Sequence, residues 1–208
     1  MGPSSGAGFY CEYYYNTKKR DVVLAIRGTD AGGDEIDWSD VLSDIQIGLA
    51  HTPSQLIKAE KAYQNIKAIA KSDFNDRYNL YLTGHSLGGG LASLLSAKHG
   101  GKPTVTFNAP GVQRSFVGGH LLDIIGRYNL NLVNTKQMLH IRANGDPVSI
   151  AAGKHMGTVE EVYVNKWGDE KILGASRHIA QHSIRNMVEA LRDRPGLYSR
   201  DLGWTSRA

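Results

Sequence analysis

Several features that would assign a chain to a specialised class of protein are missing from these 208 residues. The only cysteine is Cys11, so no internal disulfide can form. No apolar run reaches the length of about 18 residues that a transmembrane helix needs, so we expect none. The formal net charge of +4 is too small to indicate nucleic-acid binding by itself.

Motifs for metal ions and for export are missing as well. The sequence has no H-E-x-x-H motif, no pair of cysteines and no Asp-rich calcium loop, so we expect no metal ion and no other cofactor. The N-terminus lacks the basic and apolar regions of a Sec signal peptide. Residues 1–8 have the composition of a flexible segment or of the cut edge of a longer protein. Localisation therefore stays open between the cytoplasm and export by a non-classical route.

The composition that remains is that of an ordinary globular domain. Hydrophobic residues make up 41% and charged residues 21% of the chain, and this length suffices for one sizeable core. We expect a single domain over residues 9–195 and a C-terminal tail over residues 196–208. Strand-like and helical segments alternate, which predicts an α/β fold with a mostly parallel central sheet flanked by helices.

Capping and spacing signals place the individual elements. A helix is expected to begin at Thr52, its N-cap, with Pro53 in the first turn. Another is expected over residues 121–125, and a last one after Ser183. Strands are expected at residues 9–15, 21–27, 78–83, 103–107 and 138–142, and a β-hairpin at residues 159–173. The apolar stripes expected to face the core are Leu56, Ala59, Tyr63, Ile66 and Ala70, and later Ile184, Met187, Val188 and Leu191.

The most informative stretch of the chain is residues 81–90. Gly84, Ser86 and Gly88 form the pattern G-x-S-x-G, with a strand-like segment before it and leucines at helical spacing after it. In a nucleophile elbow, the serine occupies a strained turn between a strand and a helix, and the two glycines avoid clashes where these cross. The pattern predicts that Ser86 is a nucleophile.

Four segments together resemble the class 3 lipases, the fungal-lipase-like branch of the α/β-hydrolases. They are residues 22–29 (VVLAIRGT), 83–89 (TGHSLGG), 106–111 (TFNAPG) and 144–148 (NGDPV), in the family's order. The resemblance implies an α/β-hydrolase fold and a serine ester hydrolase of the lipase or phospholipase A type. Such an enzyme cleaves acyl esters of lipids, at a membrane or micelle surface, through an acyl-enzyme on Ser86. The chain differs from the family in being short, because upstream strands that are usually present are missing.

An acyl-transfer site also needs a base and a carboxylate that orients it. Asp146 follows the expected strand at residues 138–142, where catalytic groups collect in open α/β sheets, although Asn-Gly-Asp-Pro is also strong turn chemistry. The α/β-hydrolase order places the base after this aspartate, which leaves His155, His178 and His182. The resemblance places the base just before the final helix and so favours His182, with His178 as the alternative.

The oxyanion hole needs two or more hydrogen-bond donors. One is the backbone N–H of Leu87, the residue after the nucleophile. The resemblance assigns the other to Thr29, which can give a backbone N–H and a hydroxyl, in a loop that Gly28 allows to approach closely. The next residues, 31–47, occupy the family's lid position and are hypothesised to cover Ser86, although the alternative is a fixed helix.

A second class of function stays open, in which the chain is a non-catalytic lipid- or partner-binding module on an α/β-hydrolase scaffold. The fold alone does not separate the two classes. The presence of Ser86, Asp146 and a downstream histidine together argues for the enzyme. The arginine-rich C-terminal region is interpreted as a solvated face or, in the second class, as a surface that binds lipid phosphates.

Overall fold

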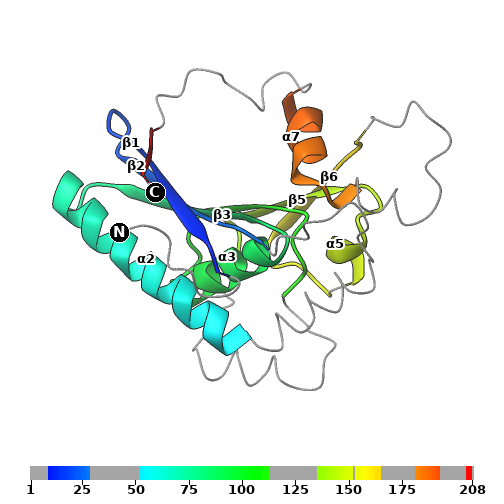
Figure 1. Ribbon diagram of the computed structural model, residues 1–208, viewed down its shortest axis with the longest axis horizontal. Helices are drawn as coiled ribbons and strands as arrows, with labels where there is room; N and C mark the ends of the chain where they lie inside the picture. Colours follow the sequence, from blue (N-terminus) through cyan, green and yellow to red (C-terminus); the bar gives the residue numbers. More distant parts are fainter. Residues whose placement is uncertain are drawn as a thin grey trace.

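The structure is a computed structural model, and it describes residues 9–28, 52–112, 135–151, 153–164, 181–192 and 205–207. A seven-stranded sheet runs through its centre (Figure 1). The strands are β1 (Cys11–Asn16), β2 (Asp21–Ile26), β3 (Asn79–His85), β4 (Thr104–Phe107), β5 (Met138–Ala143), β6 (Thr158–Val162) and β7 (Thr205–Arg207). Their order across the sheet is β6-β5-β4-β3-β2-β1-β7.

The sheet is mostly parallel, as predicted. Strands β2 to β6 pair with one another in parallel. Strand β1 pairs antiparallel with both β2 and β7. Strand β7 lies in the part of the chain that we expected to form a tail, and it pairs with Tyr13, Tyr14 and Tyr15. The carboxyl ends of β2, β3, β4 and β5 therefore meet at one edge of the sheet, where catalytic groups of α/β folds collect.

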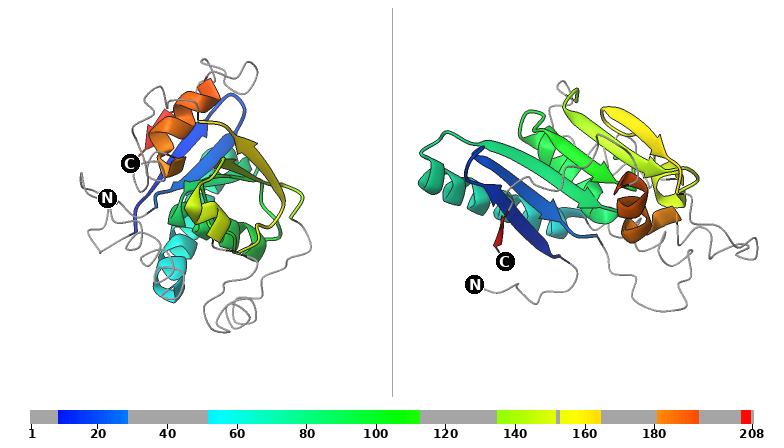
Figure 2. Two further views of the ribbon diagram at one scale, coloured as in Figure 1. Left: turned by 90° about the vertical axis from the view of Figure 1, so that its right-hand side faces the viewer. Right: turned by 90° about the horizontal axis from the view of Figure 1, so that it is seen from above.

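Four helices are described: α2 (Thr52–Phe74), α3 (Leu87–Lys98), α5 (Pro147–Ala151) and α7 (Ile184–Arg192). Helices α2 and α3 cover one face of the sheet, and α7 lies on the opposite face near β6 (Figures 1 and 2). This arrangement of helices around a mostly parallel sheet, with a serine turn after β3, is an α/β-hydrolase fold. The α/β-hydrolase expectation is confirmed.

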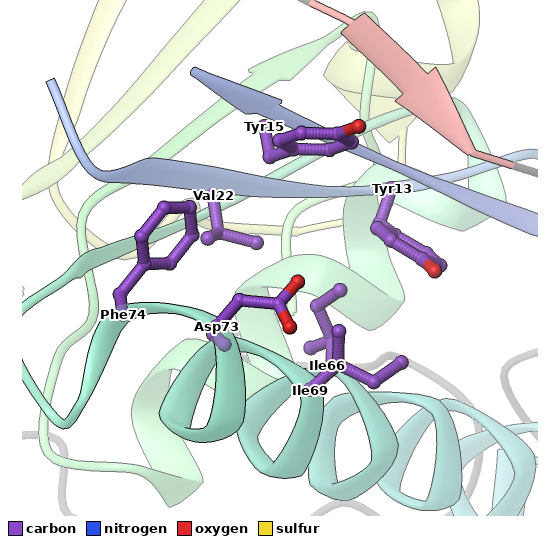
Figure 3. Close-up of a pocket in the computed structure, with 8 residues that line it drawn as sticks. Tyr13, Tyr15, Val22, Ile66, Ile69, Asp73 and Phe74 are labelled. Carbon is purple, nitrogen blue, oxygen red and sulfur yellow. The ribbon is translucent and has the colours of Figure 1, made fainter. Parts of the chain in front are cut away.

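The main core lies between the sheet and helices α2 and α3. All five residues of the predicted α2 stripe are buried there, together with alternate residues of β2. A small gap remains between β1, β2 and the C-terminal half of α2 (Figure 3). Its volume of about 10 Å³ has room for one water molecule at most, so it is a packing gap and not a substrate site.

A second, smaller cluster of buried apolar residues holds α7 against β5 and β6. Met187 is fully buried in it and packs with Ile141 and Val162, as the stripe predicted. The prediction for Ile184 was wrong, because its side chain is 40% exposed. Ile184 is the first residue of α7 and lies beyond this small cluster, so helical spacing alone does not bury it.

Some expected elements lie outside the described residues. They are the segment at residues 31–47, the helix at residues 121–125, and the second half of the hairpin that follows β6.

Candidate active site

Ser86 occupies a sharp turn between strand β3 and helix α3. Its backbone has φ 54° and ψ −132°, a conformation that non-glycine residues rarely adopt. Its N–H donates to the carbonyl of Phe107 at 3.0 Å, and its carbonyl accepts from Gly89 and Gly90 in the first turn of α3. Strained backbone of this kind persists only where the surrounding structure enforces it, and it is a mark of functional sites.

The two glycines of the motif are required by the crossing of strand and helix. A Cβ atom at Gly84 would lie 2.4 Å from the backbone carbon of Gly88. A Cβ atom at Gly88 would lie 2.2 Å from the carbonyl oxygen of Ile26 in β2. Both contacts are with backbone atoms of a helix or strand and are too short for a real Cβ atom, so the steric reason for the G-x-S-x-G spacing is present in the structure.

Asp146 and His182 are brought together from segments 36 residues apart. The distance between Asp146 Oδ1 and His182 Nδ1 is 2.7 Å, and the aspartate is completely buried. Its other oxygen, Oδ2, accepts hydrogen bonds from the backbone N–H of Ser149, at 2.8 Å, and from the Ser149 hydroxyl. Asp146 also closes the turn after β5, with its N–H bonded to the Ala143 carbonyl. Both interpretations of this residue, as a turn residue and as a partner of a histidine, are therefore compatible.

His85, the residue before Ser86, holds the backbone of His182. Its Nε2 lies 2.7 Å from the His182 carbonyl oxygen, and the two rings are 4.8 Å apart. Burial, and secondly the proximity of His182, lower the pKa of His85 from 6.5 to about 4. The ring is therefore neutral at physiological pH, and Nε2 is its N–H donor because a carbonyl only accepts. His85 therefore joins the nucleophile elbow to the segment that bears His182.

Sequence reasoning missed three further residues of the site: Ser149, Asn108 and Gln181. The side chain of Asn108 bonds the Gln181 carbonyl and the Ala143 N–H, at 2.8 and 2.7 Å. The Gln181 amide donates to the Asn144 carbonyl at 2.8 Å. Asn108 lies in one of the segments that carried the family resemblance, and this was its only signal in the sequence.

On the other side of Ser86, the end of β2 lies directly against the elbow. A Cβ atom at Gly28 would lie 2.6 Å from the His85 carbonyl oxygen and 3.0 Å from the Ser86 Cβ. It would also lie 3.4 Å from the backbone nitrogen of Leu87, the first residue of α3. The close approach expected of Gly28 is therefore present. Thr29 lies outside the described residues.

Of the other candidate bases, His178 lies outside the described residues, and His155 contacts the backbone of Ser149, where His182 contacts the Asp146 carboxylate. The Nε2 of His155 is 3.3 Å from the Ser149 carbonyl oxygen, and its ring packs against His140 at 4.7 Å. Burial, and secondly the proximity of His140, lower its pKa from 6.5 to about 4. Within the described part of the chain, the histidine that contacts the Asp146 carboxylate is His182.

Neither a cluster of metal-binding side chains nor a membrane-spanning helix occurs among the residues that the structure describes. Within them, no three metal-binding side chains gather closely enough to hold an ion. No described helix combines the length and the apolar character needed to cross a membrane.

Parts of this chain are similar to known proteins. An extracellular phospholipase A1 of Serratia liquefaciens is 39% identical over 108 residues, which are 52% of this chain and 29% of that protein. A crystal structure of a fungal lipase has a TM-score of 0.49 at 14% identity, covering 86% of this chain and 66% of the lipase. The non-glycosylated LIP2 lipase of Yarrowia lipolytica has a TM-score of 0.38 at 20% identity, covering 71% of this chain and 58% of the lipase.

The chain thus spans less than a third of the length of the Serratia phospholipase. The model of one protein family matches a much larger part of this chain. The family is described as the Tle-like phospholipase domain, and its model matches residues 3–182, from the segment before β1 to His182. This chain, with its α/β-hydrolase fold, belongs to the Tle-like phospholipase family.

Proposed function

We propose that this chain is a serine ester hydrolase that cleaves the acyl esters of phospholipids through an acyl-enzyme on Ser86. The observation that carries the proposal is the 2.7 Å contact between Asp146 and His182, joined to the nucleophile elbow through His85. Membership of a phospholipase family and the similarity to a phospholipase A1 support the choice of lipid substrate.

In the proposed mechanism, Ser86 Oγ attacks the ester carbonyl and His182 Nε2 takes its proton. The contact with Asp146 keeps the other ring proton on Nδ1, so that Nε2 is the basic nitrogen. The imidazolium then gives its proton to the departing alcohol, here a lysophospholipid. A water molecule, deprotonated by the same nitrogen, hydrolyses the acyl-enzyme and releases a fatty acid.

The ester oxygen becomes negatively charged when Ser86 attacks, and the proposal assigns its stabilisation to two backbone N–H groups. Leu87 provides one at the N-terminus of α3, where the helix dipole also favours negative charge. Thr29 is proposed to provide the other, with its hydroxyl as a further donor. The tight packing of Gly28 on Ser86 supports this assignment, because it brings the chain leading to Thr29 against the elbow.

The test is hydrolysis of a diacyl phospholipid in detergent micelles, with fatty acid and lysophospholipid as the products measured. Ser86→Ala is expected to lower the rate by at least about 10³-fold. Ser93→Ala is the matched control, because Ser93 is a buried serine of α3, the helix that follows Ser86, and its hydroxyl donates to the Gly89 carbonyl one turn earlier. The proposal fails if Ser86→Ala keeps the wild-type rate. A folded wild-type chain that binds the micelles without hydrolysis would instead favour the non-catalytic module.

A further inference from the structure

A buried asparagine at the carboxyl end of β4 lies between the two segments that bear Asp146 and His182. Asn108 is completely buried and has φ 45°, in the left-handed region that asparagine tolerates better than most residues. Its backbone N–H donates to the Ile141 carbonyl of β5 at 2.9 Å. The position and direction of its side chain are therefore fixed by the sheet.

The side-chain amide of Asn108 uses both of its ends. Nδ2 donates to the Gln181 carbonyl at 2.8 Å, and Oδ1 accepts from the Ala143 N–H at 2.7 Å. This orientation of the amide is the only one that both partners allow, because a carbonyl only accepts and an N–H only donates. A carboxylate or an aliphatic side chain of the same size would satisfy at most one of the two.

Each partner of this amide lies close in the sequence to Asp146 or to His182. Ala143 begins the turn that ends at Asp146, and its carbonyl accepts the Asp146 N–H at 3.0 Å. Gln181 immediately precedes His182. The amide of Gln181 returns to the same turn, at the Asn144 carbonyl. The acid-bearing turn and the base-bearing segment are thus joined by the two hydrogen bonds of the Asn108 amide and by the bond from Gln181 to Asn144, as well as by the contact between Asp146 and His182.

We propose that Asn108 is a positioning residue that holds the Asp146 turn and the His182 segment in register for proton transfer. The inference rests on the proposed function of Ser86. Misplacing a catalytic group by about 1 Å costs on the order of 100-fold in rate. A buried amide bonded to both segments restricts such a displacement without touching the substrate.

The decisive variant is Asn108→Gly. Glycine adopts the same left-handed backbone without strain, so this change removes the amide and little else. Thr106→Val is the matched control. Thr106 is two residues earlier, also buried, and its hydroxyl bonds His140 Nδ1 at 2.7 Å, away from the base-bearing segment. Thr106→Val loses one buried side-chain hydrogen bond next to β5 and Asn108→Gly loses two, of which the bond to the Gln181 carbonyl is the one that holds the segment of His182.

Two readouts separate positioning from general destabilisation. The first is kcat and KM on a dissolved short-chain ester. The second is the low-field proton resonance of His182 Nδ1–H in its bond to Asp146, which does not depend on turnover. Asn108→Gly is expected to lower kcat about 10- to 100-fold with little change in KM, and to broaden or shift the resonance. Thr106→Val is expected to keep both near wild type.

Equal kcat values and unchanged resonances in Asn108→Gly and Thr106→Val would overturn the proposal. If Asn108→Gly does not fold, Asn108→Asp replaces it, because aspartate tolerates the same backbone and keeps the acceptor for Ala143 while losing the donor to Gln181. Wild-type kcat in that variant would also overturn it. Absence of hydrolysis in folded wild-type protein would refute the proposed function instead, and the resonance would still test the role of Asn108.

Discussion

Acidification is expected to destabilise this fold through His85, the residue directly before the candidate nucleophile. Burial, and secondly the nearby His182, lower the pKa of His85 from 6.5 to about 4 in the folded protein. The unfolded chain therefore takes up a proton at this ring at a higher pH than the folded chain does. The contribution to stability is complete above pH 6.5 and is lost as the pH falls towards 4.

The size of the effect follows from these two pKa values. At about pH 5, the imidazole is almost fully protonated in the unfolded chain and about one-tenth protonated in the folded one. The difference lowers the free energy of unfolding by about 2 kcal/mol relative to pH 7.5. A loss of this size is a large fraction of the 5–15 kcal/mol that roughly spans the stability of ordinary domains.

Urea unfolding of the wild type and of His85→Gln, each at about pH 7.5 and about pH 5, measures this contribution of His85 to the free energy of unfolding. Glutamine retains an N–H donor for the His182 carbonyl but does not titrate. His155, whose pKa is also lowered to about 4, titrates in both proteins and cancels in the comparison. The wild type is expected to lose about 2 kcal/mol more than the variant between the two pH values. Equal losses would show that His85 is not held neutral by burial, and would refute the reasoning.

Three further predictions concern single side chains of the site. Ser149→Ala removes one of two hydrogen bonds to Asp146 Oδ2, and is expected to lower kcat about tenfold and the free energy of unfolding by about 2 kcal/mol; Ser93→Ala, measured alongside, is expected to leave kcat unchanged. Gly88→Ala places a Cβ atom 2.2 Å from a carbonyl oxygen of β2, and is expected to cost about 1–3 kcal/mol in thermal unfolding; an unchanged melting temperature would contradict the steric argument. Thr29→Val, assayed on a dissolved ester, removes the hydroxyl donor and keeps the backbone N–H, and is expected to lower kcat about 10²- to 10³-fold; wild-type kcat would contradict a role of the hydroxyl in the oxyanion hole.

Local sequence signals predicted the elements that position the site. The glycines around Ser86 have a steric role that depends only on a strand meeting a helix, so the motif predicted the elbow directly. The helical spacing of apolar residues in α2 reports one buried face, and that face is buried. The β2 segment is apolar at five consecutive positions, and only the structure shows which of them, Val22, Leu24 and Ile26, are buried in the core. The pairing of Asp146 with His182 was predicted from the order of catalytic residues along the chain and from the family resemblance, because neither residue has a local signal for the other.

The remaining features depend on contacts between distant segments. The amide of Asn108 bonds a residue 73 positions away, and nothing in its neighbourhood specifies that partner. Strand β7 has three residues, too few for alternation to be visible, and forms only by pairing with β1 at the other end of the chain. Ile184 fits the helical spacing of α7, but its burial depends on how far the cluster around Met187 extends.

The central claim is that Ser86 is a nucleophile activated by His182. Labelling of the folded protein with a reactive fluorophosphonate in detergent micelles, followed by peptide mass mapping, tests it most directly. The account predicts modification of Ser86 that His182→Ala suppresses and His178→Ala does not. Labelling suppressed only by His178→Ala would contradict the assignment of the base, and a folded wild-type protein that is not labelled at Ser86 would contradict the claim itself.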